Sequence, residues 1–185
     1  MITVGPVFSA TPGANPLPAG MEQTMDAAAS SALTELLAAY LVNVERSTGL
    51  EAPLAALGVV RFTAPGLNGT ATLGASTGTL RRSNPRGTSD RDWIAELANQ
   101  FVGRFKLKLL RAGFELWTMT PVAITGRLLI TAVSQPGIAP VAFRDVAGGA
   151  LALWMEVEVN GPLKFTPPAS DAAIPSEGDV ILFDS

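Results

Sequence analysis

The stretch from Asp90 to Arg111 constrains the fold more than any other part of the sequence, because its pattern predicts one long amphipathic helix. Thr88, Ser89 and Asp90 at its start are candidate N-cap residues, and Gly113 after it is a common stop signal. At about 100° per residue, the apolar residues of this stretch fall on one side, where they form a stripe wide enough to pack on a sheet. This expected buried face consists of Ile94, Leu97, Ala98, Phe101, Phe105 and Leu109.

The opposite side of the same helix carries a row of residues that hydrophobic patterning does not require. Asp92, Glu96, Asn99, Gly103 and Lys106 follow one another at intervals of four, three, four and three. They therefore lie within about 80° of one another around the helix axis. A glycine inside a helix costs about 1 kcal/mol relative to alanine. Gly103 therefore either lets another molecule approach closely or packs against another part of the chain.

A second helix and several strands are expected around this central helix. The stretch from Met21 to Val44 is rich in helix formers, with apolar residues at helical spacing. Strands are expected where β-branched and aromatic residues lie between turn residues, namely at Leu57–Ala64, Thr70–Leu80, Phe114–Met119, Ala123–Ser134, Ala139–Asp145 and Ala150–Val159. This order predicts an α+β fold, a sandwich in which two main helices pack on one face of a largely antiparallel sheet.

The length and composition predict one globular domain with two flanking segments. With 185 residues, of which 48% are hydrophobic, the chain can bury a substantial core. We place the domain at residues 21–160. Residues 1–20 contain four prolines and three glycines and are expected to be an extended arm or a disordered leader. Residues 161–185 form an acidic, proline-containing tail, in which Asp179–Asp184 is either an added edge strand or a docking peptide.

Several classes of function are excluded by what the sequence lacks. Without cysteine or histidine, the chain can form no disulfide, no thiolate or imidazole metal site and no Ser-His-Asp triad. Its net charge is −3 and its 13 lysines and arginines are scattered, so neither nucleic acid nor an anionic membrane is an expected partner. No apolar run approaches membrane-spanning length, and no export signal is recognisable. We therefore expect a cytoplasmic protein with no cofactor or metal of its own.

The polar row and the residues that follow it resemble the CheC/CheX/FliY family of bacterial chemotaxis phosphatases, most closely its CheX branch. The family motif is Asp or Ser, three residues, Glu, two residues, Asn, about 22 residues and then Pro. Asp92, Glu96 and Asn99 match this motif, and Pro121 follows after 21 intervening residues, one short of the usual spacing. The likeness continues through Gly103 and a G-x-x-K-x-K-L pattern, and spans roughly residues 21–159.

The resemblance implies hydrolysis of the aspartyl phosphate on a CheY-type response regulator, whose own Mg²⁺ would stabilise phosphoryl charge. Asn99 would orient the attacking water, and Glu96 would pair with a lysine of the regulator. Asp92, Gly103 and Lys106 would contact this partner. A carboxylate at the position of Asp92 also suits the first turn of any helix, and lysines near a helix end commonly do no more than face solvent.

Two other functions are open for the same fold: a non-catalytic binding module, and an assembly component like those of the flagellar switch. The resemblance further implies a homodimer formed through the sheets, in which Ala150–Val159 would pair across the interface. In the first helix, Ser31, Glu35 and Ala38 are either the relic of a second motif that lacks its amide or part of an ordinary alanine-rich helix. The three tryptophans are expected in the core or at an interface; they are Trp93, Trp117 and Trp154.

Overall fold

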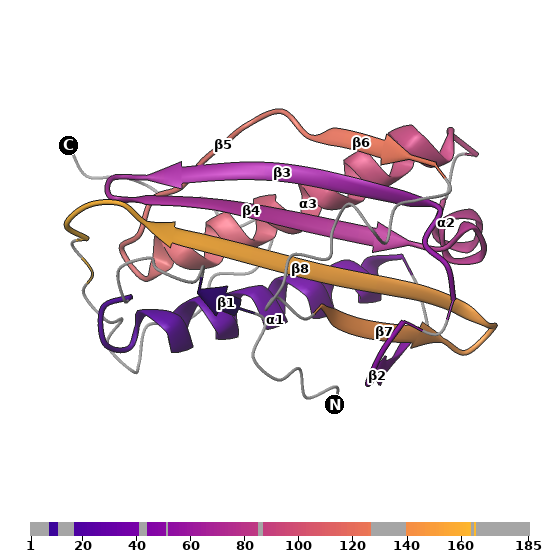
Figure 1. The fold of residues 1–185 in the computed structure, drawn as a ribbon, viewed down its shortest axis with the longest axis horizontal. Helices are drawn as coiled ribbons and strands as arrows, with labels where there is room; N and C mark the ends of the chain where they lie inside the picture. The colour runs from indigo at the N-terminus through magenta and orange to yellow at the C-terminus, as the bar shows by residue number, and fades with distance from the viewer. Residues whose placement is uncertain are drawn as a thin grey trace.

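The computed structural model describes residues 8–10, 17–40, 44–50, 52–84, 87–126, 140–163 and 165. Within these ranges the chain forms eight strands and three helices (Figure 1). In chain order they are β1 (Phe8–Ala10), α1 (Met21–Ala39), β2 (Val44–Ser47), β3 (Ala56–Ala64), β4 (Leu67–Ala75), α2 (Thr77–Ser83), α3 (Asp90–Arg111), β5 (Trp117–Thr118), β6 (Val122–Thr125), β7 (Val141–Asp145) and β8 (Gly149–Val159).

All eight strands belong to one sheet, whose main order is β2-β7-β8-β4-β3-β5. β6 also pairs with β3, and β1 pairs with β8 in the only parallel ladder among the described strands. The strand β8 therefore lies inside the sheet, with β4 along one edge and with β7 and β1 on the other. The expectation that Ala150–Val159 pairs across a dimer interface is wrong, because both of its hydrogen-bonding edges are occupied within the chain.

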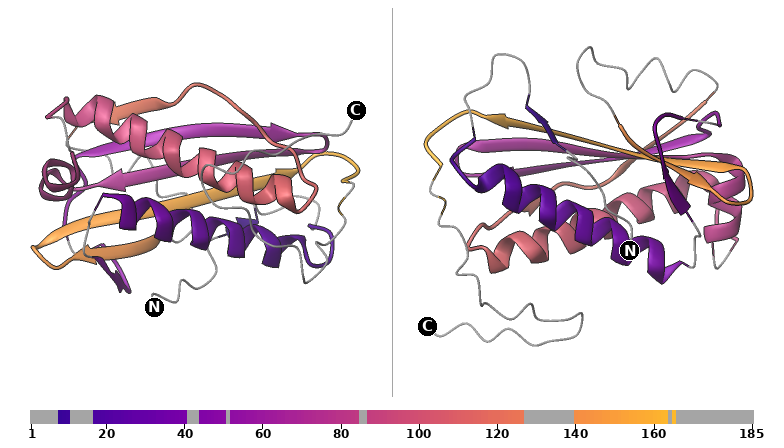
Figure 2. Two further views of the ribbon diagram at one scale, coloured as in Figure 1. Left: turned by 180° about the vertical axis from the view of Figure 1, so that it is seen from behind. Right: turned by 90° about the horizontal axis from the view of Figure 1, so that it is seen from below.

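Helices α1 and α3 lie side by side on one face of this sheet (Figure 2). The predicted fold class is thereby confirmed: an α+β protein with two main helices on one face of a largely antiparallel sheet. The core between these layers contains side chains of α1, α3 and the inner face of the sheet, including Met25, Leu33, Phe62, Phe101 and Phe105. Burial of this apolar surface is the main favourable contribution to folding.

The central helix α3 has the bounds that the sequence predicts. Its N-cap is Ser89, whose hydroxyl accepts a hydrogen bond of 3.1 Å from the Asp92 backbone nitrogen. It ends at Arg111, and Gly113 beyond it has a φ of 72°, a value that glycine adopts without strain. All six residues of the expected apolar stripe are buried.

The docking of α3 on the sheet depends on Gly58 of β3, which the sequence analysis did not single out. A Cβ atom built on Gly58 would collide with the carbonyl oxygen of Ile94 and would lie 2.7 Å from the Cβ of Ala98. The absence of a side chain therefore lets the backbones of β3 and α3 approach one another. This close approach fixes the position of α3 relative to the sheet.

Two predicted elements were too long. The first helix ends at Ala39 rather than Val44, because Tyr40 leaves helical geometry and Val44 begins β2, which pairs with β7. The predicted strand Thr70–Leu80 is wrong beyond Ala75. There Ser76 caps the short helix α2, its hydroxyl accepting a hydrogen bond of 3.4 Å from the Thr79 backbone nitrogen.

The other predicted strands are present but differ in extent, whereas β1 and β2 were not predicted. Of Phe114–Met119 only Trp117 and Thr118 form a strand, whereas Phe114 and Leu116 turn into the core. The structure has β6 at Val122–Thr125, and the predicted strand is wrong at Gly126, which lies beyond its end. Residues 127–134 of that predicted strand lie outside the described residues, as does Asp179–Asp184. Within the predicted N-terminal arm, β1 is extended and pairs with the Met155–Val157 stretch of β8.

Candidate functional site

The candidate site is the outward face of α3. The structure brings the five predicted site residues together in one row, which we call the α3 ridge: Asp92, Glu96, Asn99, Gly103 and Lys106. The first four are exposed and the fifth is partly buried. The ridge faces away from the sheet, since the opposite side of α3 is buried against β3 and β4. Another protein could therefore reach all five positions at once.

The carboxamide of Asn99 is available for an external ligand. Asn99 is exposed, and among the described residues no hydrogen bond engages its side chain. A free carboxamide offers one acceptor oxygen and two N–H donors. It can therefore hold a water molecule on one side and a polar group of a partner on the other.

The carboxylate of Glu96 is exposed but held on one side. Its Oε1 atom accepts a hydrogen bond of 2.7 Å from Nε2 of Gln100. The Oε2 atom has no partner among the residues that the structure describes. Sequence analysis missed Gln100, although its spacing of four residues from Glu96 is that of interacting pairs on a helix.

Asp92 is already engaged within the helix N-terminus. Its Oδ2 atom accepts a hydrogen bond of 2.7 Å from the hydroxyl of Ser89, while its backbone nitrogen donates to that same hydroxyl. The Ser89 hydroxyl thus caps the helix by accepting from the Asp92 backbone, and the Asp92 carboxylate holds that hydroxyl in place. The geometry therefore explains Asp92 by helix capping without requiring a partner.

Gly103 is open to solvent. A Cβ atom built on it would meet nothing within 4 Å. Of the two interpretations of this glycine, packing against another part of the chain is therefore wrong for the described residues. Close approach by another molecule is the interpretation that stays open.

The two lysines near the end of α3 differ in their surroundings. Lys106 forms no ion pair with any described residue, whereas Lys108 Nζ lies 2.6 Å from Oε1 of Glu35 on α1. Ser31, Glu35 and Ala38 are all exposed on α1. Since the carboxylate of Glu35 pairs with Lys108 and no carboxamide follows it, α1 does not repeat the arrangement of the α3 ridge.

Arg82 and the three tryptophans lie outside the α3 ridge. Arg82 donates to the buried carboxylate of Asp145, with its Nε 3.0 Å from Oδ2. This arginine therefore joins α2 to the end of β7. Trp93 and Trp154 are buried as expected, whereas Trp117 is 50% exposed at the edge of the sheet.

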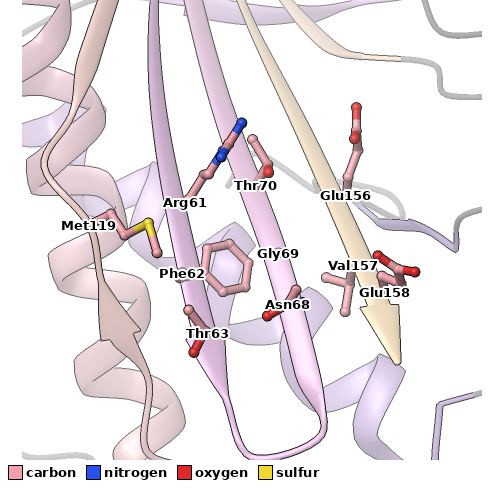
Figure 3. A pocket seen from close by; sticks show the side chains of 10 residues that line it. All are labelled: Arg61, Phe62, Thr63, Asn68, Gly69, Thr70, Met119, Glu156, Val157 and Glu158. Carbon is pink, nitrogen blue, oxygen red and sulfur yellow. The ribbon is translucent and has the colours of Figure 1, made fainter. Parts of the chain in front are cut away.

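A separate shallow pocket lies on the face of the sheet away from the helices (Figure 3). It has a volume of about 420 Å³. Two rows of aligned residues cross its floor from β3 to β8, one running from Arg61 through Thr70 to Glu156 and the other from Thr63 through Asn68 to Glu158. The pocket shares no residue with the α3 ridge.

The described ranges contain neither a cluster of metal ligands nor a membrane-spanning helix. No group of three or more acidic, histidine or cysteine side chains there could hold a metal ion. No helix in those ranges is long and apolar enough to cross a membrane.

Several solved structures resemble this one. Chemotaxis protein CheX from Vibrio vulnificus aligns with a TM-score of 0.55 at 16% identity, over 71% of this chain and 99% of its own. A CheC-like protein from Shewanella oneidensis gives 0.55 at 15%, over 74% and 100%. CheX from Borrelia burgdorferi, solved in a complex with CheY, BeF3 and Mg²⁺, gives 0.55 at 18%, over 74% and 96%.

No protein-family model and no curated protein matches the sequence. The structural matches cover nearly the whole of each neighbour. At these identities they show that this chain has the fold of CheX and CheC-like proteins, as its resemblance to them predicts.

Proposed function

Starting from the CheX-like and CheC-like fold of this chain, we propose that it is a phosphatase that hydrolyses the aspartyl phosphate of a CheY-type response regulator. The observation that carries this proposal is the α3 ridge, where a free carboxamide stands one turn beyond a carboxylate on an exposed helix. Support also comes from a structural neighbour of the same fold that was solved together with CheY.

In this proposal Asn99 positions the attacking water. The water oxygen forms a bond to phosphorus, the bond from phosphorus to the aspartyl oxygen breaks, and the products are a free aspartate and inorganic phosphate. An acyl phosphate is a mixed anhydride and therefore already activated, so orientation of the water is the main contribution required of the phosphatase. Mg²⁺ bound to the regulator would stabilise phosphoryl charge. The carboxamide of Asn99 suits this task because no described residue occupies it.

Glu96 would pair with a lysine in the active site of the regulator. The ion pair would be made by the Oε2 atom, since Oε1 accepts the hydrogen bond from Gln100. Lys106 would contact an acidic group nearby, and Asp92 would contribute mainly by capping α3. Ion pairs of this kind set the geometry of docking and the rate of encounter.

The decisive experiment measures phosphate release from a phosphorylated, Mg²⁺-loaded CheY-type regulator with and without the protein. We expect acceleration by the unaltered protein, and a rise of about tenfold in KM for Glu96→Gln, because the partner lysine then faces an uncharged amide. The variant should keep most of its kcat, since Asn99 still orients the water. A fall in kcat at unchanged KM would contradict the role given to Glu96.

Gly103→Ala should make the protein more stable and its binding of the regulator weaker. The added methyl group meets no atom within 4 Å, and alanine favours the helix over glycine by about 1 kcal/mol. We therefore expect thermal unfolding at a slightly higher temperature together with a higher KM for the regulator. Calorimetry and the phosphate-release assay measure the two effects. An unchanged KM would show that no partner backbone approaches Gly103.

Absence of acceleration with any regulator that binds would instead favour a binding module or a switch-like assembly component. The homodimer and the cytoplasmic location stay predictions. If the sheets of two copies pair, the available strands among those described are β2 at one end and β5 with β6 at the other.

A further inference from the structure

We infer that Gln100 and Tyr40 are positioning residues, which hold the carboxylate of Glu96 in the orientation that the partner lysine meets. This inference rests on the proposed phosphatase function and assigns roles to two residues outside the motif. It is carried by a chain of hydrogen bonds and ring contacts that runs from the core to the α3 ridge.

The first link is the amide of Gln100, whose orientation is fixed by its neighbours. Its Oε1 atom accepts hydrogen bonds from the hydroxyl of Tyr40 at 2.6 Å and from Nη1 of Arg104 at 3.2 Å. The guanidinium of Arg104 can only donate, so this side of the amide must be the oxygen. The opposite side is then the nitrogen, which donates to Glu96 Oε1 at 2.7 Å.

The second link is Tyr40, the C-cap residue of α1. Its ring meets the Trp93 ring edge to face, with centroids 4.9 Å apart and planes at 84°. Such pairs contribute beyond the area that they bury. Trp93 is itself buried, and its Nε1 donates a hydrogen bond of 2.9 Å to the hydroxyl of Ser83 on α2. The ring of Tyr40 is therefore held against a tryptophan of α3 that is itself fixed to α2.

These contacts restrict Glu96, whose side chain is otherwise exposed and flexible. Because Oε1 is bound from one side, Oε2 is left as the oxygen presented to a partner. Holding the rotamer in advance reduces the conformational entropy that docking must remove. Releasing it should weaken productive docking about fivefold, the effect expected from one additional free side chain.

A purely structural role for the same contacts makes different predictions. Gln100 and Tyr40 join α1 to α3, so their loss could simply loosen the helix pair. In that case the effect on KM would be independent of Glu96. If they act through Glu96, their removal should change nothing further once Glu96 is gone, because residues of one network do not contribute additively.

The experiment therefore compares Gln100→Met and Tyr40→Phe in the unaltered protein and in a Glu96→Ala background, using phosphate release from the phosphorylated regulator. Methionine keeps the length of the side chain, and phenylalanine keeps the ring against Trp93. We expect KM to rise about fivefold with kcat nearly unchanged in the first background, and no further rise in the second. The matched control Gln23→Met, on the exposed first turn of α1, should change neither quantity. Equal effects in both backgrounds, or a loss confined to kcat, would overturn the positioning role.

A second readout does not depend on the regulator. Side-chain couplings measured by NMR in the free protein should give one rotamer for Glu96, and an average over rotamers in Gln100→Met. If the unaltered protein shows this single rotamer but accelerates nothing, the proposed function fails while the hydrogen-bonded chain stands. An averaged Glu96 rotamer in the unaltered protein overturns the positioning network, whatever the turnover.

Discussion

Replacing Asn99 by alanine should lower kcat for regulator dephosphorylation by about 100-fold or more, because the attacking water then has no group to orient it. The regulator should still bind, since Glu96 and Lys106 are unchanged. The fold should also persist, because the Asn99 side chain is exposed and makes no hydrogen bond to a described residue. Phosphate release at saturating regulator measures kcat, and a direct binding titration measures affinity.

Asn68→Ala is the matched control for this prediction. Asn68 is also an exposed asparagine, but it lies in the pocket on the far side of the sheet. Its replacement should leave both kcat and KM unchanged. Turnover by Asn99→Ala within twofold of the unaltered protein would exclude the water-orienting role, and an equal loss in both variants would show that the loss is not specific to the α3 ridge.

Gly58→Ala should strongly destabilise the folded protein. Its Cβ would overlap the Ile94 carbonyl and lie 2.7 Å from the Cβ of Ala98. Backbone atoms cannot turn aside as a side chain can, so α3 must shift away from β3. Overpacking of this kind costs about 3 kcal/mol, which denaturant unfolding measures directly.

Gly103→Ala provides the opposite case on the other side of the same helix. It adds the same methyl group where nothing lies within 4 Å. The two variants should therefore shift the free energy of unfolding in opposite directions. A Gly58→Ala protein as stable as the unaltered chain would show that α3 does not depend on the close approach to β3.

The sequence was sufficient to predict the bounds and the buried face of α3, because local signals and tertiary packing agree in this helix. The cap at Ser89, the stop at Gly113 and the apolar stripe are all properties of neighbouring residues. The same regularity made the α3 ridge visible, because residues at helical spacing must share a face. The fold class followed from the order of such segments.

The features that the sequence did not predict depend on contacts between segments that are far apart in the chain. The end of α1 is set where Tyr40 meets Gln100 and Trp93 from α3, and no pattern within the first helix indicates that meeting. The sequence of α2 is likewise compatible with a strand, and its actual form depends on the Ser76 cap and on the buried Asp145 that pairs with Arg82. Gly58 is only one glycine among 18 until α3 is placed over it.

The interior position of β8 has a consequence for how the protein is made. This strand is the last of those described, yet it lies between β4 and β7 and also holds β1. During synthesis the ribosome adds about 5–20 residues per second, so the earlier strands wait for their central partner for seconds. Contacts between segments so far apart in the chain form slowly. Strands β1, β2 and β7 can therefore join the rest of the sheet only after β8 has emerged.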